Sequence, residues 1–167
     1  MIDFYNNYPQ TDYEVYFEAS LSPEARYSLI HDLKPIVEGK SEAEAVNMLL
    51  RFVQTAFEYK KDDVQFGREK PFFVEETLFY PFSDCEDRSV LFAYLVRNLI
   101  GLEVIGLDYP GHIATAVKFS TDIEGDFVKY NGKKYIICDA TYINANIGLC
   151  MSRYKKAEPK VISISGK

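Results

Sequence analysis

The hydrophobic pattern changes its period once along this chain, and that change limits the folds available to it. Between residues 41 and 100 apolar residues recur at helical spacing, whereas after Gly101 they alternate as in β-strands. Helices are predicted over residues 42–59 and from Ser83 to Gly101. Helices followed by strands predict an α+β fold, with N-terminal helices packed on one face of an antiparallel sheet.

The ends of these two helices carry capping signals. Ser41 with Glu44, and Ser83 with Glu86, form S-x-x-E capping boxes, and Gly101 is a typical helix stop. An earlier helix is predicted to begin at Ser22-Pro23 and to end at Pro35 and Gly39. Residues 13–18 are β-prone and predict a short edge strand, and residues 60–80 are interpreted mostly as loop.

Four strands are predicted in the second half of the chain, over residues 103–108, 113–119, 126–130 and 133–139. Asn131-Gly132 lies between the last two, and this dipeptide favours a type I′ hairpin turn.

Length and charge exclude several classes of protein. The 167 residues suit a single domain, and a net charge of −6 offers no basic patch for nucleic acid. The apolar runs are too short for a membrane span, and the first ten residues do not resemble a signal peptide. We therefore expect either a cytoplasmic protein or a domain excised from an exported one. Three cysteines and two histidines form no disulfide framework or zinc pattern, so no cofactor or metal is expected.

The stretch "PFSDCEDR" places Cys85 in the first turn of a predicted helix. The helix dipole favours a thiolate there, whereas the acidic neighbours oppose it. A cysteine nucleophile therefore needs a nearby imidazole that a third group orients. The sequence offers His112, which follows a Tyr-Pro-Gly turn at a strand start, and Asp139, which ends the last predicted strand.

These candidates impose a condition on the sheet. A strand rises about 3.3 Å per residue, so the start of one strand meets the end of its neighbour only if the two run antiparallel. His112 and Asp139 can meet only if strands 113–119 and 133–139 pair in this way, with 126–130 beyond them or in the loop.

The stretches "SDCEDRSVLFAYLVR", "GLEVIGLDYPGHIATAVKF" and "YIICDATY" together resemble the transglutaminase-like superfamily of papain-like cysteine enzymes. The resemblance covers residues 42–145, so residues 1–40 are a cap on the domain or the seam to an upstream domain of a larger multidomain chain. The family commonly has Pro-Thr after the aspartate, whereas Ala140 follows here, and "STDIEGDF" is an insertion.

The resemblance implies a papain-like core and acyl transfer on amide bonds. Cys85 would be the nucleophile, His112 the general base and acid, and Asp139 the group that orients the imidazole. Tyr80 is our candidate side-chain donor in the oxyanion hole. The expected substrate is a peptide, protein or cell-wall-type amide. By analogy with small bacterial members, we prefer a peptidase or amidase.

Three alternatives stay open at the level of sequence. An amine acceptor in place of water would make the protein a cross-linking transglutaminase. The fold could instead serve as a catalytically silent binding or scaffold module. The three residues could also be coincidental in a protein–protein contact domain, and that reading predicts a sheet order that separates His112 from Asp139.

Overall fold

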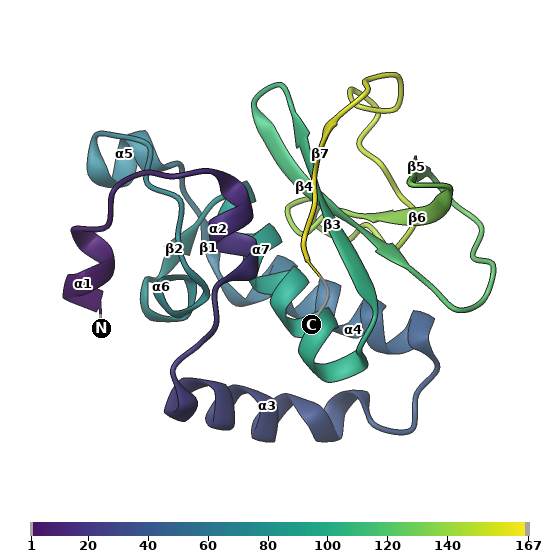
Figure 1. Cartoon of the computed structure of the whole chain (residues 1–167), viewed down its shortest axis with the longest axis horizontal. Coiled ribbons are helices and arrows are strands. Elements are labelled where there is room, and N and C mark those ends of the chain that lie inside the picture. Colours follow the sequence, from purple (N-terminus) through teal and green to yellow (C-terminus); the bar gives the residue numbers. More distant parts are fainter. Residues whose placement is uncertain (1, 166–167) are drawn as a thin grey trace.

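The computed structural model describes residues 2–165 and has a mixed α+β architecture (Figure 1). Three longer helices dominate the helical part, and the third continues into a π-helical turn: α3 (Pro23–Val37), α4 (Glu42–Ala56), α7 (Cys85–Leu95) and η1 (Val96–Ile100). Four short helices accompany them: α1 (Ile2–Asn6), α2 (Tyr13–Glu18), α5 (Asp62–Phe66) and α6 (Val74–Phe79).

The main sheet has five strands in the order β5-β6-β4-β3-β7, and all its neighbours are antiparallel. Its strands are β3 (Glu103–Tyr109), β4 (His112–Lys118), β5 (Phe127–Tyr130), β6 (Lys133–Cys138) and β7 (Lys160–Ile162). A separate parallel pair joins β1 (Glu58–Tyr59) to β2 (Phe82–Ser83), just before α7. The predicted α+β class, with helices packed on an antiparallel sheet, is therefore correct.

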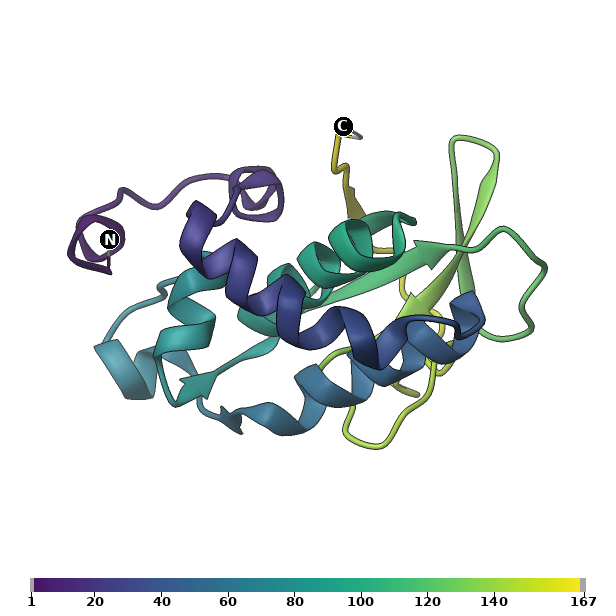
Figure 2. The same cartoon turned by 90° about the horizontal axis from the view of Figure 1, so that it is seen from below.

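The sheet is covered on both faces. One face packs on the helices through Val104, Ile113 and Val117, in a core that also contains α7 and the inner side of α4. The other face, with Leu107 and Ala114, packs under a C-terminal segment that contributes residues 150–157. Figure 2 shows α3 and α4 running side by side along the helical layer.

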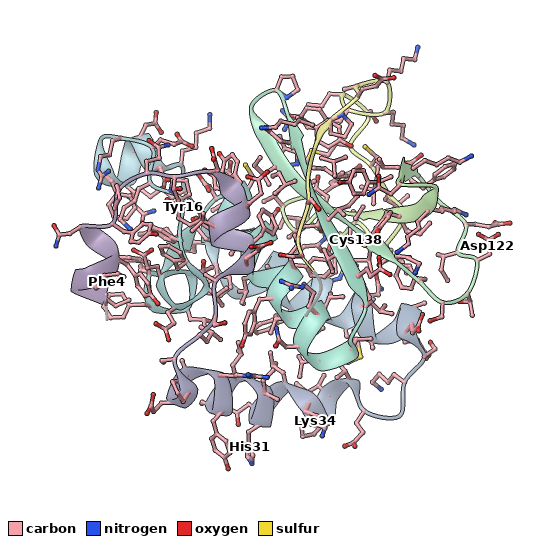
Figure 3. All side chains as sticks on the ribbon, in the orientation of Figure 1. Phe4, Tyr16, His31, Lys34, Asp122 and Cys138 are labelled. Carbon is pink, nitrogen blue, oxygen red and sulfur yellow. The ribbon has the colours of Figure 1, made fainter. Side chains whose placement is uncertain are left out.

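Helix α7 lies at the centre of the molecule. Residues 86–95 are all buried, so this helix has no solvent face, whereas the sequence predicted a single inward stripe. In Figure 3, Tyr16 and Cys138 lie inside the molecule, while His31 and Lys34 project from the outer side of α3. A central helix of this kind can hold a side chain at its N-terminus with little freedom to move.

The predicted edge strand over residues 13–18 is wrong, because this segment is the helix α2. Tyr16 and Phe17 are buried and Tyr13 is half-buried, whereas Val15 is exposed. This is the i, i+3, i+4 spacing of one helix face rather than the alternation of a strand. Packing of these aromatic rings therefore decides the conformation of a segment whose composition favours a strand.

Other predicted boundaries also move. Helix α3 continues through Pro35 to Val37, because burial of Leu33 and Val37 outweighs the one backbone hydrogen bond that proline removes. Helix α4 ends at Ala56, and residues 60–80 contain α5 and α6 rather than mostly loop.

The predicted turns are confirmed. Asn131 and Gly132 have φ angles of 49° and 75°, as a type I′ hairpin between β5 and β6 requires. Gly101 has a φ of 82° and ends the helical segment with a bond to the Val96 carbonyl. No helix among residues 2–165 is long and apolar enough to cross a membrane.

Candidate active site

Cys85 is the first residue of α7, as the sequence predicts, but a different residue caps the helix. Asp84 occupies the N-cap, and its backbone N–H donates to Asp87 Oδ2 at 3.1 Å. The predicted N-cap, Ser83, instead accepts a hydrogen bond from Arg88 Nε at 3.0 Å. The capping box is thus displaced by one residue, since burial of Arg88 engages the Ser83 hydroxyl.

One of the acids around Cys85 has a structural role. Asp87 is completely buried, and its Oδ1 accepts the backbone N–H of Phe72 at 2.8 Å. This carboxyl therefore fastens the start of α7 to the segment before α6. Burial, followed by the charges of Asp84 and Asp62, raises the pKa of Asp87 above its ordinary value.

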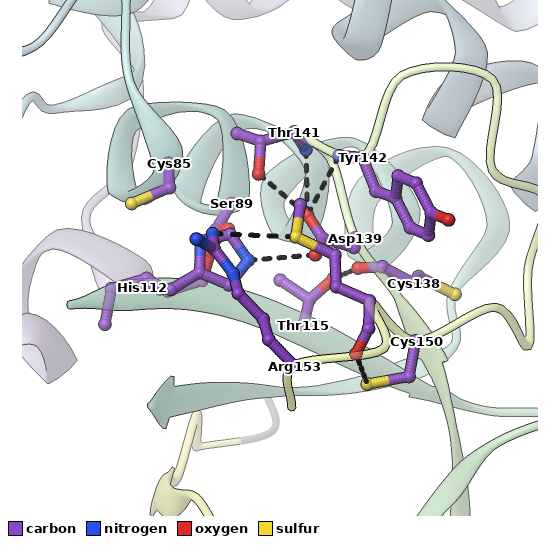
Figure 4. Close-up of polar contacts among 12 residues, drawn as sticks. Cys85, Ser89, His112, Thr115, Cys138, Asp139, Thr141, Tyr142, Cys150 and Arg153 are labelled. Atoms are coloured by element: carbon purple, nitrogen blue, oxygen red, sulfur yellow. Dashed lines mark hydrogen bonds and ion pairs between the residues drawn. The ribbon is translucent and has the colours of Figure 1, made fainter. Parts of the chain in front are cut away.

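His112 and Asp139 lie in hydrogen-bond contact, with 2.8 Å between His112 Nε2 and Asp139 Oδ2 (Figure 4). The antiparallel pairing of β4 and β6, with Thr115 opposite Cys138, brings them together. The pairing condition set by the sequence is therefore met, and the sheet order that would separate the two residues is absent. Because Nε2 faces the carboxylate, Nδ1 is the ring nitrogen left to act on another group.

Asp139 is held by more than the histidine. Its Oδ1 accepts the Thr141 backbone N–H and hydroxyl at 2.9 and 2.8 Å, and the Tyr142 N–H at 3.2 Å. Burial alone would raise the pKa of Asp139, but the bonds from His112 and Thr141 keep it below its usual value. The carboxylate is therefore fixed in its charged form as a partner for the imidazole.

The helical layer also holds the backbone of this strand end. Gln54 of α4 is buried, and its amide Nε2 donates to the carbonyls of Asp139 and Ala145, each at 3.0 Å. One side chain thus ties α4 to both ends of the turn that carries the aspartate.

An aromatic stack fixes the imidazole plane. The Tyr154 ring lies 5.0 Å from the His112 ring, with only 5° between their planes, and it also stacks on Tyr109. The Arg153 guanidinium also lies over the Tyr154 ring, 4.6 Å from its centroid. Sequence reasoning missed Tyr154, which comes from the C-terminal segment that covers the sheet.

Cys85 and His112 line one cleft, a cavity of about 360 Å³. Tyr13 and Tyr59 also line it, and neither was predicted as a site residue. Among residues 2–165 no hydrogen bond joins Cys85 to His112, and the thiol donates instead to Glu86 Oε2 at 3.1 Å. Cys85 and His112 therefore share a cleft without a hydrogen bond between them, and Asp139, which does not line this cleft, contacts His112.

The surroundings of Cys85 disfavour its thiolate. Burial, followed by the charge of Glu86, raises the pKa of Cys85 well above that of a free thiol, and a hydrogen bond from the Ile113 backbone offsets this only in part. In this arrangement the sulfur is protonated at neutral pH. Chemistry at Cys85 therefore needs the thiol to turn from Glu86 to the imidazole.

The other two cysteines are core residues. Cys138 is fully buried on the opposite side of the sheet from Asp139, as its place in the alternation predicts, and Cys150 is buried under the sheet's second face.

Tyr80 lies at the C-terminal end of α6, and its ring stacks on Phe72 at 5.0 Å. It is not among the residues that line the cleft of Cys85. Tyr80 as an oxyanion donor therefore stays a prediction, and Tyr13 and Tyr59 lie closer to where such a donor would act.

Carboxylates form one wall of the cleft. Burial, followed by the charge of Asp84, raises the pKa of Asp62 to about 7 and that of Glu86 to about 10. Oxygens of Asp62, Glu69 and Glu86 lie within 4.8 Å of one another, as do ligand atoms of Asp84, Cys85 and Glu86. These are the described side chains that could hold a metal ion.

No protein-family model matches this chain, and no curated protein matches it.

Proposed function

We propose that the chain is a cysteine-dependent acyltransferase with a transglutaminase-like, papain-like core, acting as a peptidase or amidase. The observation that carries the proposal is the contact of His112 with Asp139 in the cleft that Cys85 also lines. A buried imidazole, held by a carboxylate and stacked on a tyrosine, is an oriented base with one free nitrogen.

The reaction begins with a proton transfer. The Cys85 thiol turns from Glu86 to His112 Nδ1 and gives up its proton, and the thiolate sulfur attacks the carbonyl carbon of an amide. The C–N bond then breaks as the imidazolium protonates the leaving amine, which leaves a thioester on Cys85. Water, deprotonated by His112, attacks the thioester, releases the acid and restores the thiol. Asp139 stabilises the imidazolium in both steps.

A backbone N–H at the start of α7 and one side chain would hold the oxyanion. Tyr80 is one candidate for this side chain. Tyr13, whose phenol lies within the electrostatic reach of Cys85, is better placed.

Two other functions have specific support. The bond of Cys85 to Glu86 favours a catalytically silent binding module, because a thiol held there is protonated. The acidic wall favours a protonated amine as acceptor, which would give cross-linking in place of hydrolysis.

The test is the rate of iodoacetamide labelling at each cysteine, measured by peptide mass spectrometry in EDTA at pH 7. Buried Cys138 and Cys150 serve as internal references. We expect Cys85 to label fastest, and His112→Ala to slow it about tenfold or more. Labelling of Cys85 at the rate of an ordinary thiol, with no response to His112→Ala, would support the silent module instead.

A second assay separates hydrolysis from amine transfer. A peptide-amide library is incubated with the protein, with and without a dansylated primary amine. Free carboxyl products indicate a hydrolase, whereas dansyl incorporation indicates a cross-linking enzyme. Neither product from wild type, with Cys85→Ala as the blank, would count against acyl transfer on these amides.

A further inference from the structure

Three carboxylates from separate parts of the chain meet on the wall of the cleft. Asp62 begins α5, Glu69 follows that helix, and Glu86 lies in the first turn of α7. One oxygen of each lies within 4.8 Å of the other two. A cation about 2.3–2.6 Å from each oxygen would hold them at such separations.

Two of these side chains are buried with oxygens that have no partner. Asp62 is 1% exposed and Glu86 3% exposed, and neither Asp62 Oδ1 nor Glu86 Oε1 receives a hydrogen bond. Asp84 Oδ1, beside them, is in the same condition. Buried carboxyl oxygens normally have a hydrogen-bond partner or bind a metal.

No ion pair neutralises these carboxyl groups within residues 2–165, although the charge of Lys70 partly offsets the raised pKa of Asp62 at longer range. Within residues 2–165, no lysine, arginine or histidine forms an ion pair with Asp62, Glu69, Asp84 or Glu86. Asp62 Oδ2 accepts the backbone N–H of Lys70, a neutral donor, at 2.6 Å. A bound cation would satisfy the unpartnered oxygens.

We propose that Asp62, Glu69 and Glu86 bind a divalent cation that prefers oxygen ligands, of the Ca²⁺ or Mg²⁺ type. Three carboxylates are hard ligands, and water would complete the coordination shell. Glu69 is exposed and lies at the mouth of the site, so an ion can enter from solvent. The site uses no atom of Cys85, His112 or Asp139, so it stands whether or not those residues catalyse acyl transfer.

The proposal is tested by calorimetric titration of the EDTA-treated full chain with CaCl₂ and, separately, MgCl₂. We expect one saturable site with a dissociation constant of about 1 mM or tighter for at least one ion. Glu69→Gln should weaken binding about tenfold or more, and because Glu69 is exposed this variant should fold. Asp63→Asn is the matched control, since Asp63 lies on the same cleft wall but outside the three, and it should weaken binding less than about threefold.

Several results would overturn the site. A binding heat that does not saturate at millimolar ion would mean that the acidic surface attracts cations without a defined site. An equal loss of affinity in Glu69→Gln and Asp63→Asn would mean the same. Binding of Zn²⁺ alone, abolished by Cys85→Ala, would replace the oxygen site with one that uses sulfur. Binding of butylammonium with the same dependence on Glu69, in the absence of Ca²⁺ or Mg²⁺ binding, would assign the wall to an organic amine.

Discussion

The thiol of Cys85 donates its hydrogen bond to Glu86, the next residue in the chain, although His112 lines the same cleft. Glu86 is buried, so its carboxyl group acts on the sulfur with little screening by water. The bond holds Cys85 as a resting thiol, and Glu86 is the side chain that, after burial, most raises the pKa of that thiol.

Replacing Glu86 by glutamine should therefore speed labelling of Cys85. At a pH of about 10.5, above the Glu86 pKa of about 10, the wild-type carboxyl group is charged, so the substitution lowers the pKa of the thiol and raises the thiolate fraction by about three- to tenfold. The measurement is the iodoacetamide rate in EDTA. Asp63→Asn removes one charge from the same wall without touching the sulfur, and it should change the rate less. An unchanged or slower rate in Glu86→Gln would show that burial, rather than charge, suppresses the thiol.

Asp139→Asn should abolish the activating effect of His112 on Cys85. The amide oxygen can still accept the Thr141 backbone N–H, but it cannot stabilise an imidazolium. We expect labelling of Cys85 to fall to the level of His112→Ala, and unfolding in urea to require about 1–3 kcal/mol less free energy.

The matched control is Thr141→Val, which removes only the hydroxyl that donates to Asp139. It should cost about 1 kcal/mol of stability and leave the labelling rate close to wild type. If both variants slow labelling equally, the geometry of the turn matters rather than the charge of the carboxylate.

The contact of His112 with Asp139 could be anticipated from the sequence. The alternation of apolar and polar residues and the Asn131-Gly132 turn predict that β5 pairs with β6. Antiparallel pairing of β4 with β6 then places the start of β4, with His112, beside the end of β6, which Asp139 follows. The sequence pattern of the strands and turn is sufficient to predict this contact, because His112 and Asp139 lie at the ends of regular strands.

The rest of the site depends on contacts between distant, irregular segments. Tyr154 reaches His112 from a segment without periodicity, and Asp62 approaches Glu86 from the start of the short helix α5. The composition of residues 13–18 predicts a strand for Tyr13, since six residues give too short a window to separate the helical period from the strand period. Such residues carry no pattern of their own, so only the tertiary structure brings them to the cleft.

Gln54→Leu should destabilise the protein through the turn that carries Asp139. The substitution removes the Gln54 donor from two buried carbonyl groups, and the Asp139 carbonyl then keeps only the Tyr142 N–H at 3.3 Å, which should cost about 2–4 kcal/mol in free energy of unfolding. Thr55→Ala is the control, because Thr55 is exposed and its hydroxyl donates only to the Arg51 carbonyl within α4. Urea denaturation of both variants checks this. A loss below about 1 kcal/mol in Gln54→Leu would mean that water reaches the carbonyl groups.

Glu103 should make a small part of the stability depend on acid pH. Its carboxylate accepts hydrogen bonds from Lys133 and Lys118, and these lower its pKa to about 2. Because the folded pKa lies below the unfolded value, the contribution is complete above pH 4.5 and is lost as pH falls from there toward 2. The side chain is 48% exposed, so solvent screening limits the contribution to under about 1 kcal/mol.

Glu103→Gln should accordingly lower the melting temperature slightly at pH 7 and flatten the fall in stability between pH 4.5 and 2 relative to wild type. Salt at about 1 M should shrink the difference at pH 7, because it screens exposed ion pairs. Glu44→Gln is the control, because the Glu44 carboxylate accepts hydrogen bonds from Ser41 and forms no ion pair among the described residues. The same melting experiments on this variant show the effect of losing a hydrogen bond without losing an ion pair. If salt left the change in melting temperature of Glu103→Gln unaltered but reduced that of Glu44→Gln, the ion pairs of Glu103 would not be the source of its contribution.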